Sequence, residues 1–306
     1  IDASVDAAEE GIEEQLEEQL VSSVPGMLED ALSSLSLSTT LDVADASYTL
    51  TAIPQSVDVE PQGIELPMLT QIVPDSAIAA FLADGPTGSP FADYTRPTFL
   101  STDGGIELGF SVDFFNQALR AFWAGGLLDM QMTDEDLGID LAPLGLLLPG
   151  LSDLTLRTEA RLPAMFILNP DTEAKTQLIL QLGDLYVQLH DGEVTDESLY
   201  MEIYLSGMVP CEVQISDDGE NFEMTTEEAT LYLDVLEGGS SSLSREGAEG
   251  AFEVLVPMFL PEITGALASI PIPQMDGYTI TGLELLMYGP ASRKGYVGLT
   301  GNLFVD

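Results

Sequence analysis

The chain has 306 residues, of which 45% are hydrophobic, and it carries 52 acidic against 8 basic side chains, a formal net charge of −44. Such a length and hydrophobicity allow a folded body with a sizeable core, so we expect the charge on its surface. The shortage of Lys and Arg excludes nucleic acid as a partner and disfavours electrostatic docking on an anionic membrane. Adaptation to salty surroundings explains the acidity best, and an exterior rich in divalent cations is the alternative.

The single cysteine, Cys211, excludes an internal disulfide. The longest apolar run, residues 141–148, is shorter than the ~18–20 residues that a membrane-spanning helix needs. The sequence opens on a charged, helix-forming segment without Met or a signal peptide. We therefore expect a processed product or a fragment of a longer protein.

Residues 1–35 are predicted to form one long amphipathic helix, because apolar side chains recur at steps of three and four. Leu20, Val24 and Leu28 belong to its apolar stripe, and the opposite face is acidic without Lys partners. Pro25 and Gly26 should bend this helix. At ~1.5 Å per residue it would span roughly 50 Å, a length typical of an elongated domain.

Residues 38–67 are predicted to be strands joined by proline-containing turns, and residues 68–105 are expected to be rich in loops. A short helix is predicted at 111–124, capped by Asp113 and ended by the two glycines that follow it. A second short, apolar helix is expected at 141–149. The apolar side chains of the first short helix include Phe114, Phe115 and Phe122.

From 154 to 236 the pattern changes to long strands, in which apolar residues alternate with polar or small ones. Such alternation predicts an antiparallel sheet with one apolar side. Turn signals separate the strands at 169–171, 191–192 and 217–221. The alternating apolar positions include Leu178, Leu180, Leu182, Leu199, Met201, Ile203, Leu205, Leu231, Leu233 and Val235.

The segment 238–244 is rich in Gly and Ser and is expected to be a flexible link. A second long amphipathic helix is predicted near 246–268, kinked by Pro257 and Pro261. Closing strands are predicted at about 277–288 and 295–305. The apolar face of the helix includes Phe252, Leu255, Phe259, Ile263 and Leu267.

Catalytic and metal-binding patterns are weak. His190, the only histidine, is expected to be a solvated turn residue, and Cys211 a buried small hydrophobic residue. No Gly-x-Ser-x-Gly elbow is present, and one histidine with one cysteine excludes an ordinary zinc site. We therefore expect no enzyme.

Two acidic runs could offer oxygen ligands to calcium, although neither matches an EF-hand loop. The run at 217–221 is better explained as a hairpin turn, and the run at 134–140 as a loop with a helix cap. The carboxylates and amide concerned are Asp217, Asp218, Glu220 and Asn221, and Asp134, Glu135, Asp136 and Asp140.

Three stretches together resemble the bactericidal/permeability-increasing family of the tubular lipid-binding proteins, which includes lipopolysaccharide-binding, phospholipid-transfer and cholesteryl-ester-transfer proteins. The last stretch resembles the family's final helix, proline hook and closing strands. It runs from Val256-Pro-Met-Phe-Leu-Pro-Glu-Ile through Tyr278-Thr-Ile-Thr-Gly to Gly295-Tyr-Val-Gly-Leu. The middle one, Ile106-Glu-Leu-Gly-Phe-Ser-Val-Asp-Phe-Phe-Asn-Gln-Ala-Leu, resembles its strand and Phe-Phe-Asn helix. The first, Thr40-Leu-Asp-Val-Ala-Asp-Ala-Ser-Tyr-Thr-Leu-Thr, resembles its passage into the central sheet.

The resemblance implies an α+β fold: an elongated tubular barrel in which long helices are wrapped by a highly twisted antiparallel sheet. Residues 1–67 would be the tail of a first barrel with central-sheet strands, and residues 68–306 a C-terminal lipid-binding barrel. Two features depart from the family. Its lipopolysaccharide-binding members carry a basic tip on a first barrel that is mostly absent here, and the chain present is acidic. Its one cysteine also cannot form the family's disulfide.

The implied function is lipid binding or transfer without catalysis, in a protein secreted, periplasmic or at the surface of a bacterium living in salty water. No cofactor is implied, apart from a bound phospholipid or other acyl lipid. A cell-surface partner, and a homo-oligomer joined through the ends of the elongated molecule, are two further partners that the sequence allows. The alternative is a structural or adhesive surface protein that uses the same fold without a ligand. Acyl chains would contact Leu20, Val24, Leu28, Phe114, Phe115, Phe122, Phe252, Leu255, Phe259, Ile263 and Leu267.

Overall fold

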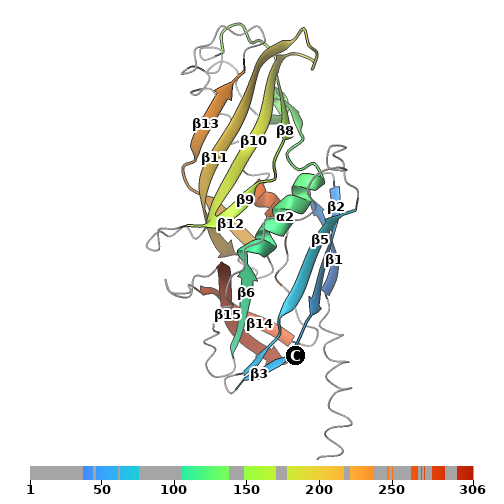
Figure 1. Ribbon diagram of the computed structural model, residues 1–306, viewed down its shortest axis with the longest axis vertical. Helices are drawn as coiled ribbons and strands as arrows, with labels where there is room; N and C mark the ends of the chain where they lie inside the picture. The colour runs from blue at the N-terminus through green and yellow to red at the C-terminus, as the bar shows by residue number, and fades with distance from the viewer. Residues whose placement is uncertain are drawn as a thin grey trace, which may run out of the picture.

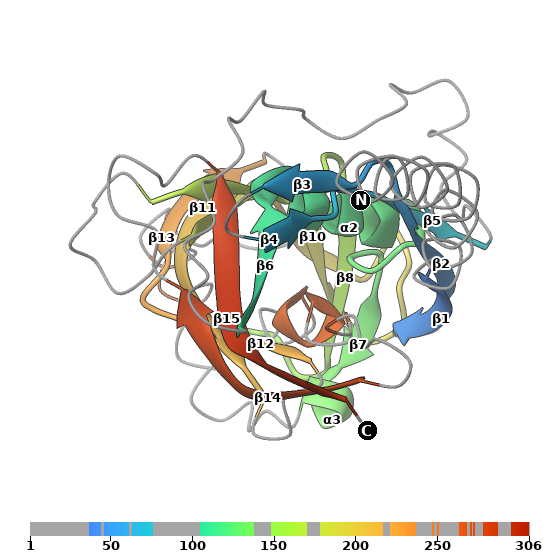
Figure 2. The same ribbon diagram turned by 90° about the horizontal axis from the view of Figure 1, so that it is seen from below.

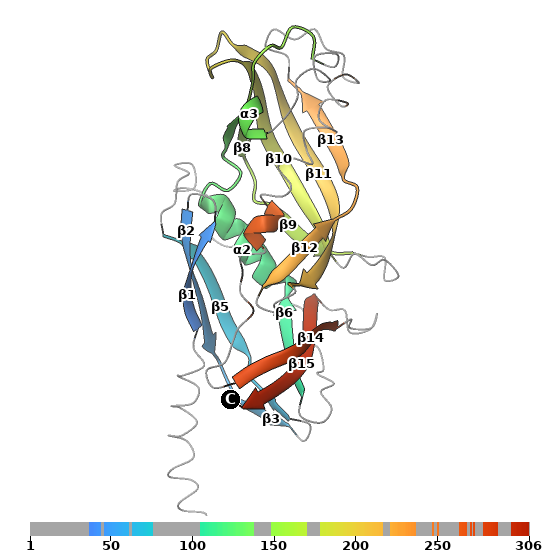
Figure 3. The ribbon, with the colours of Figure 1, turned by 180° about the vertical axis from the view of Figure 1, so that it is seen from behind.

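The computed structural model describes residues 37–43, 46–60, 63–75, 105–137, 148–169, 178–216, 221–236, 247, 250, 263–267, 270, 272, 278–286 and 295–305. Its largest sheet has the strand order β12-β11-β10-β8-β7, with β13 also paired to β11 and β9 to β10. This sheet curls into a half-barrel at one end of an elongated molecule (Figures 1 and 3). Its strands are β7 (Gln131–Thr133), β8 (Leu154–Ala160), β9 (Met165–Leu168), β10 (Leu178–Asp191), β11 (Leu199–Ile215), β12 (Phe222–Thr226) and β13 (Thr230–Val235).

The curl follows from the length of the two central strands, β10 and β11. The first part of β10 pairs with β9 and its second part with β8, while the first part of β11 pairs with β13 and its second part with β12. Each long strand therefore exchanges one neighbour for another along its course. Right-handed twist accumulates over so many residues and turns the sheet's apolar side inward.

Three smaller sheets complete the described part. One has the order β1-β2-β5, a second β14-β15-β6, and the third is the pair β3-β4. Their strands are β1 (Leu37–Val43), β2 (Ala46–Pro54), β3 (Asp58–Glu60), β4 (Gly63–Glu65), β5 (Met68–Pro74), β6 (Gly105–Ser111), β14 (Tyr278–Leu286) and β15 (Tyr296–Val305).

Helix α2 (Val112–Ala124) lies between these sheets and begins directly after β6 (Figure 1). Ser111 caps it, since its hydroxyl accepts a hydrogen bond from the backbone N–H of Phe114 at 3.1 Å. Asp113 is therefore an acidic residue of the first turn and not the cap that we predicted. The Asn116 side chain pairs with the backbone of Phe166 on β9, donating at 3.1 Å and accepting at 2.6 Å, so the helix is fixed to the curled sheet.

The predicted fold class, long helices wrapped by a sheet, is wrong for the described residues. They are mostly strand, and besides a helical run at 263–267 their helices are α2, with 13 residues, and α3 (Asp134–Leu137), with four. The physical reason is that the long, curled strands β10 and β11 contribute more of the buried apolar side chains than the described helical run at 263–267 does. Part of the predicted second long helix is described as a helical run at 263–267, while the predicted helix at 1–35 lies outside the described residues. Within the described part, no helix is long and apolar enough to cross a membrane.

Most predicted strands are confirmed, including the two closing strands and the alternating ones between 154 and 236. The expected loop after residue 67 is wrong at its start, where β5 pairs with β2 in the register Leu50↔Ile72. The expected apolar helix at 141–149 lies largely outside the described residues, and its described end is a bend and turn at Leu148 and Pro149. The division into units at residues 67 and 68 stays a prediction.

Candidate functional site

The concave face of the curled sheet is apolar over the whole described length of its central strands. The inward side chains of β10 and β11 alternate with outward ones that are mostly polar or tyrosine, and none of the inward ones named below is more than 5% exposed. Among the described elements, β10 is contacted mainly by the strands paired with it, β8, β9 and β11. The face comprises Leu154, Leu156, Leu178, Leu180, Leu182, Leu185, Val187, Leu189, Met201, Ile203, Leu205, Val209, Cys211 and Val213.

The interior contains no buried Asp, Glu, Lys or Arg within the described ranges. The buried polar side chains of the described residues are Asn116, Thr155, Thr158 and His190, of which Thr155 and His190 lie on the outer side of the sheet. Thr158 illustrates how they are satisfied, because its hydroxyl donates to the Leu128 carbonyl at 2.6 Å and accepts from the Met130 N–H at 3.2 Å. An interior without charge accepts apolar groups at no desolvation cost and disfavours a buried headgroup.

Phenylalanine rings close the end of the half-barrel near α2. Phe115 lies 5.6 Å from Phe222 and 6.4 Å from Phe166, centroid to centroid, in edge-on arrangements. Phe110 of β6 packs edge-on against Phe222 at 4.8 Å and tilted against Phe114 at 5.7 Å. Two of the predicted lipid-contacting residues, Phe114 and Phe115, therefore pack ring to ring at the base of the concavity.

Phe122 takes a different place, on the side of α2 that meets the β1-β2-β5 sheet. Its ring stands edge-on to Tyr48 of β2 with centroids 5.0 Å apart, and the Tyr48 hydroxyl donates to the Phe122 carbonyl at 3.3 Å. Phe122 and Tyr48 are both fully buried. This residue therefore joins α2 to the β1-β2-β5 sheet, and the sequence alone could not separate it from the other two phenylalanines.

Ile263 and Leu267 lie in the helical run 263–267, which Figure 2 shows inside the curl when the molecule is viewed along its long axis. Both are 1% exposed and belong to the same apolar cluster as α2, β10 and β11. The structure thus places Ile263, Leu267, Phe114 and Phe115 in one buried apolar cluster. The other predicted contact residues, Leu20, Val24, Leu28, Phe252, Leu255 and Phe259, lie outside the described residues.

His190 is not the solvated turn residue that we predicted, because it is 2% exposed at the end of β10. His190 alternates with the inward Leu189 and is paired with Thr155 of β8, so it lies on the outer side of the strand and is buried beside Ser198 of the following turn. Its Nδ1 lies 3.1 Å from the hydroxyl oxygen of Ser198, and its buried Nε2 has no hydrogen-bond partner. Burial lowers the pKa of His190 below its usual value, so the ring is held neutral.

The pair of His190 and Ser198 lacks the arrangement that activates a nucleophile. The Ser198 hydroxyl donates to the Glu193 carbonyl at 2.5 Å, so its proton is not directed at the imidazole. Cys211 is buried as predicted, and burial raises the pKa of its thiol to about 11, which keeps it protonated.

The described parts of the two acidic runs have structural roles, while Asp140, Asp217, Asp218 and Glu220 lie outside the described residues. Asp136 accepts hydrogen bonds from the backbone N–H and hydroxyl of Thr133, at 2.9 and 2.8 Å, which lowers the pKa of its carboxyl and caps α3. β11 and β12 form a hairpin in which Ile215 is paired with Phe222 and the Ser216 N–H donates to the Asn221 carbonyl at 3.0 Å. The described residues hold no group of three or more His, Cys, Asp or Glu placed to bind a metal.

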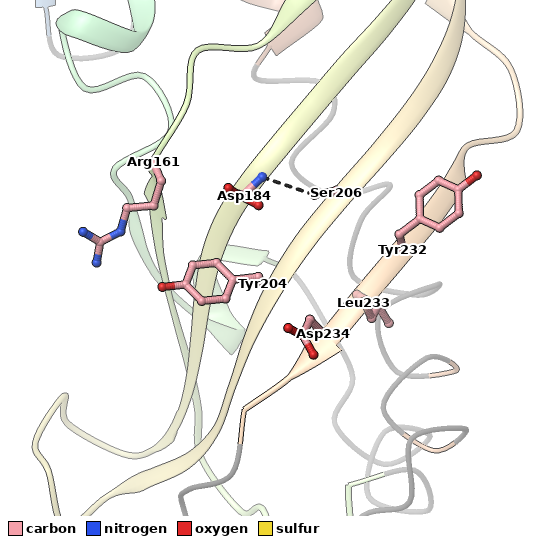
Figure 4. A pocket seen from close by; sticks show the side chains of 7 residues that line it. All are labelled: Arg161, Asp184, Tyr204, Ser206, Tyr232, Leu233 and Asp234. Atoms are coloured by element: carbon pink, nitrogen blue, oxygen red, sulfur yellow. Dashed lines mark hydrogen bonds between the residues drawn. The ribbon is translucent and has the colours of Figure 1, made fainter. Parts of the chain in front are cut away.

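The outer face of the same sheet carries a hollow that the sequence analysis missed. It is lined by residues of β10, β11 and β13 together with Arg161 (Figure 4). The available signal was the recurrence of tyrosine at outward positions of three strands, Tyr186, Tyr204 and Tyr232. Only strand pairing places these positions side by side.

No protein-family model matches the chain, and no curated protein matches its sequence. Among solved structures, lipopolysaccharide binding protein is similar at a TM-score of 0.40 and 14% identity, over 96% of this chain and 60% of that one. P47 of Clostridium botulinum E1 is similar at a TM-score of 0.29 and 8% identity, over 86% of this chain and 81% of that one. The chain thus spans 60% of the length of lipopolysaccharide binding protein. Likenesses this distant carry no conclusion about a ligand.

Proposed function

We propose that this protein binds lipid without catalysing a reaction, and that it holds acyl chains against the concave face of β8, β10 and β11. The observation that carries the proposal is the uninterrupted apolar character of that face on strands of 14 and 17 residues. Each methylene transferred from water to such a face contributes ~0.8 kcal/mol. A long acyl chain could therefore bind without any charged clamp for its headgroup.

Two features of the interior support an acyl ligand over a polar one. The rings at the base give the concavity a closed, apolar end, and the described interior has no buried charge. The neutral His190 and the protonated Cys211 add no reactive group. The resemblance of three sequence stretches to lipid-transfer proteins points the same way. Transfer between membranes, membership of that family and a location outside the cell belong to the same proposal.

The proposal is tested on purified protein by native mass spectrometry, combined with organic extraction and analysis of the extract. We expect discrete mass additions that disappear on extraction and match acyl lipids. The delipidated protein should then bind a fluorescent fatty acid saturably. Clean native masses, no extractable lipid and no saturable binding would instead favour the structural or adhesive protein.

A pair of matched variants locates the ligand. Val187 points inward and is fully buried, whereas Gln188, its neighbour in β10, points outward and is partly exposed. Val187→Phe should reduce fatty-acid binding because the added ring occupies ligand volume, and Gln188→Phe should leave it unchanged. If the face is instead a close-packed core without ligand, Val187→Phe should lower the free energy of unfolding by ~1–3 kcal/mol through overpacking. Neither variant should then change fatty-acid binding.

A further inference from the structure

The hollow on the outer face has a volume of about 340 Å³ and is open to solvent, and Asp184 and Asp234 at its edge are exposed. It lies on the side of the sheet opposite to the apolar concavity, so it is independent of the lipid proposal. Figure 4 shows two carboxylates, Asp184 and Asp234, on either side of the Tyr204 ring. The lining residues are Arg161, Asp184, Tyr204, Ser206, Tyr232, Leu233 and Asp234.

Strand register arranges these residues as a grid. Tyr186, Tyr204 and Asp234 lie side by side across β10, β11 and β13, and the next outward row contains Ser206 paired with Tyr232. Asp184 occupies the β10 position of that second row, since its N–H donates to the Ser206 hydroxyl at 3.2 Å. Neighbouring strands are ~4.8 Å apart and same-face residues ~6.8 Å apart. The two carboxylates therefore stand at opposite corners, with an aromatic ring between them.

Asp184 reaches its corner through a β-bulge. The register skips from Leu182 to Leu185 opposite Gly207 and Leu205, so that two residues of β10 face Ser206 alone. Asp184 has a φ of +47°, the only positive value among the described non-glycine residues. Its carbonyl accepts from the Arg161 N–H at 3.3 Å, which fixes the bulge. A glycine would adopt this conformation without strain.

The polar groups of the cluster are divided between paired and free ones. Arg161 lies with its guanidinium carbon 5.4 Å from the Tyr186 ring centroid and forms an ion pair with Glu159 at 3.1 Å. Tyr186 itself donates to Glu202, which also accepts from Gln188 at 2.9 Å. The carboxylates of Asp184 and Asp234, by contrast, make no hydrogen bond or ion pair with any described residue.

We propose that this hollow binds a small aliphatic diamine, with one ammonium group at each free carboxylate and the carbon chain across the Tyr204 ring. Carboxylates only accept hydrogen bonds, so the ligand must supply donors, and a net charge of −44 attracts cations and repels phosphates. The arginine stacked on Tyr186 shows that this cluster already holds one organic cation over a tyrosine ring. The hydrocarbon between the two ammonium groups matches an aromatic floor better than a bare metal ion does.

The test is calorimetric titration of the full chain with 1,6-diaminohexane, hexylamine and 1,6-hexanediol, three probes of one length and different charge. We expect saturable one-to-one binding of the diamine, at least about tenfold weaker binding of the monoamine, and no binding of the diol. Magnesium chloride at equal charge concentration controls for diffuse counterion attraction. Diol binding equal to that of the diamine, or displacement of the diamine by equimolar magnesium, would overturn the proposal.

Charge-matched variants separate the site from the overall acidity. Asp184→Asn with Asp234→Asn should weaken diamine binding about tenfold or more. The control pair Glu223→Gln with Glu227→Gln removes the same charge from exposed positions near β12 and should change binding less than twofold. Tyr204→Phe should bind as the parent does, and Tyr204→Leu about threefold more weakly because the ring is lost. Equal weakening in both charge-matched pairs would show diffuse attraction and refute the site.

Asp184→Gly distinguishes a binding role from a structural one. Glycine relieves the strained φ, so the unfolding midpoint should rise, while diamine binding falls as in Asp184→Asn. A higher midpoint with undiminished binding would refute the role given to this carboxylate.

Discussion

Replacing Gly125 by alanine tests whether α2 is held rigidly between the two sheets. Gly125 follows the last residue of α2 with φ −81°, a conformation that alanine adopts without strain. A Cβ added there would lie 2.6 Å from Cζ and 2.8 Å from Cε1 of Tyr48, in addition to a closer clash with its hydroxyl oxygen. To reach the ~3.5 Å of ordinary carbon contact, the two residues must separate by roughly 0.9 Å.

Tyr48 has little freedom to move. It is 0% exposed, stands edge-on to Phe122, and donates its hydroxyl proton to the Phe122 carbonyl. Displacement would cost ~1 kcal/mol for the hydrogen bond, ~1 kcal/mol for the aromatic pair and ~1–3 kcal/mol for overpacking. Because these terms overlap, we expect Gly125→Ala to lower the free energy of unfolding by about 3 kcal/mol.

The assay is urea unfolding followed by the fluorescence of Trp123, the only tryptophan, whose indole N–H donates to the Ala160 carbonyl at 2.7 Å. A double-mutant cycle with Tyr48→Ala supplies the control. In that background the clash is gone, so the added methyl should cost little or be stabilising. A cost below ~0.5 kcal/mol in the parent, or the same cost in both backgrounds, would refute the predicted contact.

Two further changes address charge and pH. Thermal midpoints should rise between low and molar KCl because screening weakens repulsion among 52 acidic side chains, and a flat or falling trend in a calorimetric salt series would show that the acidity is compensated. Burial lowers the pKa of His190 in the folded state, so the unfolded chain takes up its proton first as pH falls. The stability that His190 contributes is complete above about pH 6.5 and is lost below it. The difference in unfolding midpoint between the parent and His190→Gln should therefore shrink from pH 8 to pH 5. A difference that does not change with pH would contradict this prediction.

Local pattern by itself determined much of the architecture. Alternation over 178–191 and 199–215 predicted two long strands and correctly identified their apolar side, because side chains of a strand alternate between its faces. The apolar period at 111–124 and the glycines after it predicted the body and end of α2. The choice of cap differed by two residues, since Ser111 and Asp113 have equally suitable side chains and only the backbone conformation selects between them.

Long-range pairing decided the rest. The sequence did not predict β5 because the hydrogen bonds that make Met68–Pro74 a strand come from its partner, β2. The seven residues of β5 do not by themselves indicate that pairing. Pairing with Thr155 and a contact with Ser198 bury His190, although its sequence neighbours suggested a solvated turn. The same reason hid the outer hollow: Tyr204, Tyr232 and Asp234 are ordinary outward residues of separate strands until β11 and β13 pair. Sequence period determines which face a side chain takes, whereas pairing and curl, driven by burial of the whole apolar surface, determine which faces meet.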